Sequence, residues 1–95
     1  QLERFEPFGA GNQRPAFLLP GAVIHSISVS GPEQNHLKLR VRVDGTDLTV
    51  LAFRMADRRS ELAPEASIDL AGYPVINTFN GRTSLEWHAI DFRIS

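Results

Sequence analysis

One stretch, residues 35–43, constrains the fold of this chain more than any other. From Leu37 to Val43, apolar and basic residues alternate without a break. An alternation with a period of two is typical of a β-strand that buries one face. The apolar face needs a core to pack on, and the basic residues of the other face lie about 6.5–7 Å apart along the strand. These basic residues are Lys38, Arg40 and Arg42.

Two interpretations of this basic face remain open at the level of the strand. Its spacing is close to the phosphate repeat of a nucleic-acid strand, which favours binding. Rows of charged side chains are more often simply solvated. Between residues 36 and 59 the chain carries six basic and three acidic residues, although its net charge is −1. Positive charge is therefore concentrated in the middle of the chain, while indiscriminate binding to nucleic acid is disfavoured.

The length and composition limit the class of protein. A chain of 95 residues predicts one domain. The absence of cysteine excludes a disulfide framework and a thiolate metal site, and fits a reducing compartment such as the cytoplasm. No apolar run approaches the roughly 20 residues that a membrane span requires, so we expect no membrane partner. The chain begins with Gln1 instead of Met and shows no signal peptide, so we expect a fragment of a larger protein.

The order of predicted elements favours one fold. Residues 1–16 are rich in glycine and proline and are expected to form a lead-in segment that packs on the domain formed by residues 17–95. Three strands, a short helix and two further strands follow, which predicts an all-β, five-stranded OB-fold barrel with one short helix between strands 3 and 4. An SH3-like barrel and a split β-sandwich are the rivals. The predicted strands are 22–29, 37–43, 47–53, 67–73 and 83–94, and the predicted helix is 55–62.

Several details of the strands can also be predicted. Asp44-Gly45 and Asn80-Gly81 are tight-turn sequences that predict hairpins. Pro74 is expected to end its strand or to lie on an edge. The apolar residues of the last strand change phase, which predicts a β-bulge near His88-Ala89. The large aromatic residues assigned to the core are Phe5, Phe17, Phe53, Trp87 and Phe92.

The sequence contains no convincing catalytic or metal site. Its three histidines are far apart and none forms a His-x-x-x-His pair. No nucleophile elbow is present, and the carboxylates are scattered. We therefore predict no catalytic residue and no bound metal within these residues, and the chain's own sequence does not decide whether it belongs to an enzyme.

A binding function remains. In an OB-fold, strands 2 and 3 and the loops beside them form the ligand face. Cations that follow a phosphate backbone, together with aromatic rings on which bases stack, are what single-strand binding requires. Core packing is the alternative for Phe79. The candidate nucleic-acid-binding residues are Lys38, Arg40, Arg42, Arg54, Arg82 and Phe79.

Three segments together carry a family resemblance. They are residues 6–17 with the Glu-Pro-Phe-Gly-Ala-Gly-Asn sequence, residues 36–39, and residues 80–86 with the later Asp91. In this order and spacing they resemble the OB domain of the RecJ family of single-stranded-DNA-specific exonucleases. Two positions depart from the family pattern, because Phe79 stands where relatives often have Trp and Gln13 where they often have Pro.

The resemblance implies a specific role. Enzymes of this family degrade single-stranded DNA from the 5′ end and serve repair and recombination. They use Mn²⁺ or Mg²⁺ held by a DHH-type catalytic core, and their OB domain guides the strand toward that core. No Asp-His-His sequence occurs here, so the metal is expected in catalytic domains absent from this fragment. The implied partners are single-stranded DNA, the catalytic domains of the same parent chain and a single-strand-binding protein.

Two other functions fit the same residues. In one, the domain is a protein-interaction or structural barrel whose basic strand docks an acidic partner, such as the tail of a single-strand-binding protein. In the other, it is an OB module that binds RNA.

Overall fold

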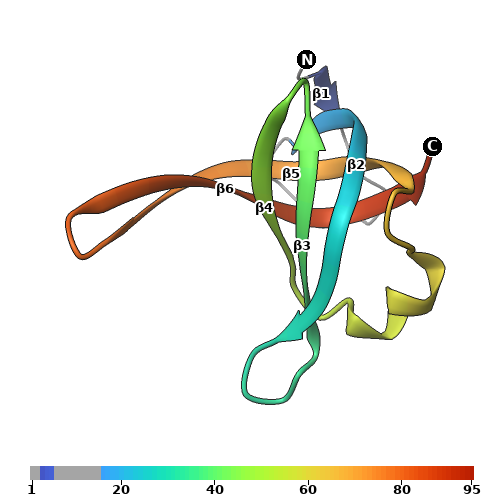
Figure 1. Ribbon diagram of the computed structural model, residues 1–95, viewed down its shortest axis with the longest axis horizontal. Coiled ribbons are helices and arrows are strands. Elements are labelled where there is room, and N and C mark those ends of the chain that lie inside the picture. The colour runs from blue at the N-terminus through green and yellow to red at the C-terminus, as the bar shows by residue number, and fades with distance from the viewer. Residues whose placement is uncertain (1–2, 6–15) are drawn as a thin grey trace.

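The computed structural model describes residues 3–5 and 16–95. Most of the predicted lead-in, residues 6–15, lies outside the described part. Within the described residues the chain forms six strands and one short 3₁₀ helix (Figure 1). In order they are β1 (Glu3–Phe5), β2 (Ala16–Ser30), β3 (His36–Val43), β4 (Thr46–Ala52), η1 (Ala56–Glu61), β5 (Ser67–Phe79) and β6 (Arg82–Ile94).

Strands β2 to β6 close into a barrel. Strands β2, β3 and β4 form an antiparallel meander, β4 pairs with β6 in parallel, and β6 pairs antiparallel with β5. Strand β5 then returns to pair with β2, which closes the sheet, and β1 pairs antiparallel with the first residues of β2. The predicted all-β OB-fold, with its short helix between the third and fourth barrel strands, is confirmed.

The alternation in β3 places its residues as predicted. Leu37, Leu39 and Val41 are completely buried, whereas the basic residues between them are exposed. Each buried side chain of this kind contributes about 1.5–3 kcal/mol to folding. Trp87 and Phe92 also lie in the core, as predicted. Because the barrel closes around a single core of its own, it meets the physical requirement for a domain that folds alone.

Strand β2 is longer than the predicted 22–29 because it continues through Pro20-Gly21. The register with β5 shifts between Leu19 and Ala22, and Gly21 adopts a φ of 68°. This irregularity lets one strand pair with β5 through its first half and with β3 through its second half. The Pro-Gly pair thus bends the strand without ending it.

Strand β5 also passes through a proline. Its pairing with β2 ends at Gly72, so Pro74 lies on an edge, where its missing N–H breaks no hydrogen bond with β2. Beyond this point β5 and β6 continue as a two-stranded arm, residues 76–85, which projects from the barrel (Figure 1). Asn80 and Gly81 at its tip have φ values of 51° and 74°, as a type I′ hairpin turn requires.

A β-bulge corrects the phase of β6, close to its predicted position. Ala71 pairs with Asp91 and Gly72 pairs with Ala89, so Ile90 is the additional residue. A strict alternation would place Trp87 and Phe92 on opposite faces of the strand. The bulge between them reverses the alternation, and both side chains therefore face the core.

The core assignment of two other aromatic residues was wrong. Phe53 is 45% exposed and Phe17 is 36% exposed. Each follows a fully buried alanine, Ala52 or Ala16, and adjacent residues of a strand point to opposite faces. The side chain of Phe5 lies outside the described part of the structure, so its assignment to the core stays a prediction.

Helix η1 is a 3₁₀ helix, and the side chain of Arg58 connects it to the barrel by hydrogen bonds. Arg58 donates hydrogen bonds to Glu61, to the Asp91 carboxylate and to the Phe92 carbonyl. Its guanidinium carbon also lies 3.9 Å from the Phe92 ring centroid. These contacts raise the pKa of Arg58, chiefly through Glu61, and lower the pKa of Glu61.

Among the described residues no helix is long and apolar enough to cross a membrane.

Candidate nucleic-acid interface

The outer face of β3 carries the predicted basic row. Lys38, Arg40 and Arg42 are all exposed, and in the antiparallel pairing with β4 they stand opposite Leu51, Thr49 and Asp47. Arg40 donates a hydrogen bond of 2.7 Å from Nη1 to the Thr49 hydroxyl. Within the described part of the chain, the Lys38 ammonium has no hydrogen-bonding or ionic partner. The charges of the row therefore differ in how far neighbouring groups engage them.

Arg42 is partly neutralised by its neighbour on β4. Its Nε donates to Oδ1 of Asp47 over 3.1 Å, and Nε2 of His25 lies 3.9 Å from the same oxygen. The hydrogen bond and the charge of Arg42 hold the pKa of Asp47 below its ordinary value. Both side chains are about half exposed, so solvent weakens the attraction between them. Lys38 and Arg40 thus offer the less compensated charges of the row.

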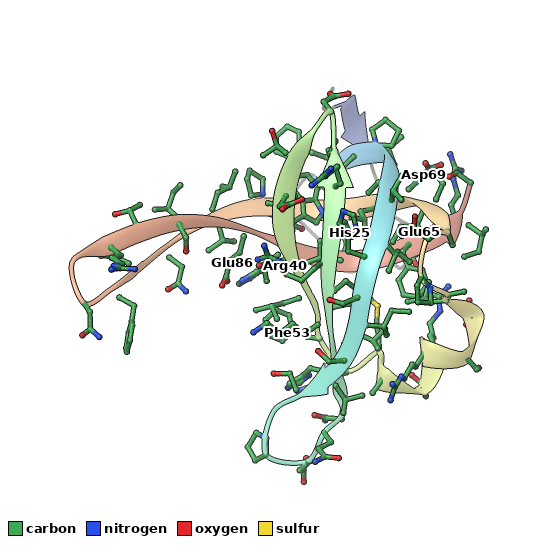
Figure 2. The ribbon with its side chains drawn as sticks, viewed as in Figure 1. His25, Arg40, Phe53, Glu65, Asp69 and Glu86 are labelled. Atoms are coloured by element: carbon green, nitrogen blue, oxygen red, sulfur yellow. The ribbon has the colours of Figure 1, made fainter. Side chains whose placement is uncertain are left out.

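The same outer face continues across β6 and β5. Thr49 pairs with Glu86 and Leu51 with His88 in the parallel β4–β6 ladder. His88 in turn pairs with Tyr73. Residues paired in register point to the same side of a sheet, so one surface runs from β3 over β4 and β6 to β5. Figure 2 shows Arg40, Glu86 and Phe53 gathered on the side of the barrel from which the arm leaves.

Phe79 and Arg82 lie at the tip of the arm. They pair with each other and, by the alternation along β5, belong to the same face as Tyr73. Phe79 is 73% exposed, so the core alternative for this residue is wrong. The projecting arm separates this pair from the basic row of β3 (Figure 1).

Arg54 lies at the opposite end of the row. It follows β4 closely, has a φ of 62°, and its backbone N–H donates to Nδ1 of His36 over 2.9 Å. Because His36 begins β3, this bond ties the end of β4 to the start of the basic strand. The six predicted binding residues are thus all exposed, with three in one row, one at its end and two on the arm.

Phe53 is a surface residue that the sequence interpretation missed. Its ring lies between two histidine rings, with centroid distances of 5.3 Å to His36 and 5.1 Å to His88. Val50 and Ala52 face the core, so strict continuation of this alternation would have predicted that Phe53 lies on the outer face. The contact with His88 depends on the parallel β4–β6 pairing, for which the local sequence carries no signal.

One carboxylate borders this aromatic group. Oε1 of Glu86 lies 3.3 Å from Nε2 of His88, and Oε2 accepts a hydrogen bond of 3.3 Å from the Asn77 side chain. Its side chain is only 19% exposed. The outer face therefore combines the basic row, the rings of Phe53 and its two histidine neighbours, and the carboxylates of Asp47 and Glu86. In the described ranges no three His, Asp or Glu side chains lie close enough together to hold a metal ion.

Comparison with known proteins identifies this barrel. A family model described as the RecJ OB domain matches residues 1–91. The chain belongs to the RecJ OB domain family. The resemblance seen in the sequence is thereby confirmed, and the exposed face described above is that of a RecJ OB domain.

Full-length RecJ proteins contain the same domain. The chain is 33% identical over 93 residues to the single-stranded-DNA-specific exonuclease RecJ of Thermus thermophilus. It is 24% identical over 103 residues to the protein of the same name from Bacillus subtilis. Each match covers 98% of this chain, but only 12% and 13% of the relatives' length, respectively.

Two crystal structures share the fold of this RecJ OB domain. RecJ of Thermus thermophilus in complex with Mn²⁺ matches with a TM-score of 0.59 and 32% identity. Its complex with Mg²⁺ matches with a TM-score of 0.58 and 33% identity. Each match covers 95% of this chain and 12% or 13% of that protein, so the chain corresponds to a small part of those structures.

Proposed function

We propose that this RecJ OB domain binds single-stranded DNA and guides the strand toward the catalytic part of its parent protein. The observation that carries the proposal is the row of Lys38, Arg40 and Arg42 on the exposed face of β3. Alternate residues of a strand are about 6.5–7 Å apart, which is close to the spacing of phosphates in an extended single strand. A positive groove that follows the backbone is the common element of single-strand binding by OB-folds.

The arm extends this path in the proposal. Arg82 supplies a further cation, Phe79 supplies an exposed ring on which a base can stack, and Arg54 adds charge at the other end of the row. Both relatives are named as single-stranded-DNA-specific exonucleases, which supports DNA as the ligand. We further propose that residues 1–16 pack on the barrel, residues 17–95, and link it to the catalytic part of the parent chain.

Catalysis belongs elsewhere in this proposal. The chain spans only 12–13% of the named relatives, and the related structures are complexes with Mn²⁺ and Mg²⁺. We propose that the same metals act in the catalytic domains of the parent protein, which works in DNA repair and recombination in the cytoplasm. A single-strand-binding protein is proposed as a second partner that delivers the strand.

A binding titration tests the proposal. A fluorescent single strand of about 15–20 nucleotides, a few OB-fold site sizes, is titrated with the domain at several salt concentrations. Phosphate contacts release counterions, so affinity should fall steeply with salt. Arg40→Ala should weaken binding to all sequences alike and reduce the salt slope by about 1. Arg59→Ala, which removes an exposed arginine from η1, is the matched control and should change neither quantity.

Other outcomes point to the other functions. Binding that does not respond to salt, or that Arg59→Ala weakens as much as Arg40→Ala, contradicts the basic-row mechanism. A short acidic peptide that saturates the domain while oligonucleotides do not would support a docking module for an acidic partner. Preference for a matched RNA strand in competition would support an RNA-binding OB module.

A further inference from the structure

Phe53 differs from an ordinary exposed phenylalanine in how its ring is held. A single apolar residue at the surface is common and by itself indicates nothing. Here the ring packs against aromatic partners from two other strands, His36 on β3 and His88 on β6. The planes meet at 73° and 77°, which is the edge-to-face geometry that aromatic pairs prefer.

Both histidines are themselves fixed. The Nδ1 atom of His36 accepts the backbone N–H of Arg54 over 2.9 Å. The Nε2 atom of His88 lies 3.3 Å from Glu86, which also binds Asn77. The Phe53 ring is therefore held in place before any ligand arrives, although nearly half of its surface is open to solvent. A ligand that packs on such a ring loses less free energy to side-chain ordering than one that must immobilise a free ring.

The surroundings of the ring match a nucleotide in size and charge. Lys38 stands opposite Leu51 of β4, and Phe53 follows Leu51 by two positions, in the turn that begins directly after Ala52. Two residues along a strand span about 6.5–7 Å, roughly one nucleotide step in an extended strand. Arg54 is the next residue along the chain. A base on Phe53 would thus have cations near the phosphates on either side of it.

The carboxylate of Glu86 disfavours binding of a phosphate at the Phe53 site. This carboxylate lies within hydrogen-bonding reach of His88, whose ring packs against Phe53. A negative charge at this position repels a phosphate oxygen but does not repel the uncharged face of a base. Figure 2 shows Phe53 and Glu86 together with Arg40 in the angle between the arm and β4.

We propose that Phe53, held between His36 and His88, is a fixed stacking site for one base of the bound single strand. This proposal rests on the proposed function and adds to it a second aromatic contact, on the barrel itself, in addition to Phe79 on the projecting arm. Lys38 and Arg54 hold the flanking phosphates. The ligand at this site is a nucleobase of any identity, because every base has an aromatic face.

Comparison of phenylalanine variants tests the site. Phe53→Leu should weaken binding of the oligonucleotide by roughly 5- to 100-fold, the range for loss of one stacked base, with an unchanged salt slope. Phe17→Leu removes a ring of similar exposure, at the start of β2, and should bind as the unmodified domain does. Phe53→Trp keeps an aromatic ring, so it should bind about as tightly as the unmodified domain, and its fluorescence should be quenched when the oligonucleotide binds.

A strand without bases separates stacking from charge. A strand of equal length with tetrahydrofuran spacers in place of nucleosides keeps its phosphates but has nothing to stack. It should bind equally to the Phe53→Leu variant and to the unmodified domain. If the unmodified domain shows no salt-dependent binding to any strand, the proposed function fails. If it binds and Phe53→Leu binds equally well, the stacking site alone is refuted. If Phe53→Leu weakens binding of the abasic strand as much as binding of the oligonucleotide, residue 53 does not act through a base, and the stacking site is refuted.

Discussion

Gly72 of β5 lies directly against the carbonyl oxygen of His88 on β6. A Cβ atom on Gly72 would stand 2.1 Å from that oxygen and 2.9 Å from the Cα of Ala89. This is the point at which β5 ends its pairing with β2 and at which the bulge at Ile90 shifts the register with β6. The contact is between backbones, so no side-chain rotation can relieve it.

Gly72→Ala should therefore be one of the most destabilising substitutions in the chain. We expect a loss of about 3 kcal/mol or more in the free energy of unfolding, because a methyl group must displace backbone at the barrel seam. Urea unfolding measures the change. Gly81→Ala is the matched control, since it has a φ of 74° but open space around its Cα, and should cost only about 1 kcal/mol. Equal losses at the two positions would contradict the close approach.

Asp47→Asn should strengthen binding of single-stranded DNA. The substitution removes the carboxylate that engages Arg42 and leaves that guanidinium free for a phosphate. Affinity at low salt should rise by roughly fivefold, and the salt slope should steepen by about 1. Asp57→Asn removes the same charge from η1, away from the basic row, and should have a much smaller effect. Equal gains from both variants would mean that only net charge matters.

The titration of Asp47 should depend on Arg42. Arg42→Ala removes the largest cause of the lowered pKa, so the pKa of Asp47 should rise toward 3.8. A carboxylate with a lowered pKa in the folded state stabilises the fold above its ordinary pKa, and this stabilisation is lost as pH falls through the lowered value. The unmodified domain should thus lose more stability than the variant on acidification below about pH 4. Carboxyl NMR titration and acid unfolding measure the two effects, and an unchanged Asp47 pKa would exclude this pairing in solution.

Arg58→Ala should loosen the attachment of η1 to β6. Arg58 bonds to Glu61 and Asp91 and covers the Phe92 ring. We expect a loss of about 2 kcal/mol in stability by urea unfolding. Arg58→Lys should recover only part of this loss, because an ammonium cannot make the forked contact of a guanidinium. Arg59→Ala, at an exposed neighbouring position, should stay within about 0.5 kcal/mol.

Much of the fold follows from local patterns. The alternation at Leu37, Leu39 and Val41 predicts their burial correctly because a single strand determines which face a residue occupies. Asp44-Gly45 and Asn80-Gly81 form their turns because few other residues adopt the positive φ values that tight hairpins need.

The errors arise where distant strands decide the outcome. The predicted bounds of two strands were too short, because β2 begins at Ala16 and not at residue 22, and β5 extends to Phe79 and not only to residue 73. Both strands pass through a proline, because Pro20 lies at a bulge and Pro74 at an edge, where the missing N–H breaks no hydrogen bond between β2 and β5. Likewise the aromatic group around Phe53 forms only because β6 lies beside β4, a parallel pairing between segments far apart in the chain.

That parallel pairing also controls when the complete outer face of the barrel can form. The barrel closes through Val23 with Ser67 and through Ala52 with Ala89, contacts that join distant parts of the chain. Folds dominated by such contacts form slowly, in milliseconds to seconds. A growing chain on the ribosome can assemble the β2–β3–β4 meander early, but this sheet has open edges until the last strand emerges. The complete outer surface can therefore form only after residues 86–89 of β6 have been synthesised and have paired with β4.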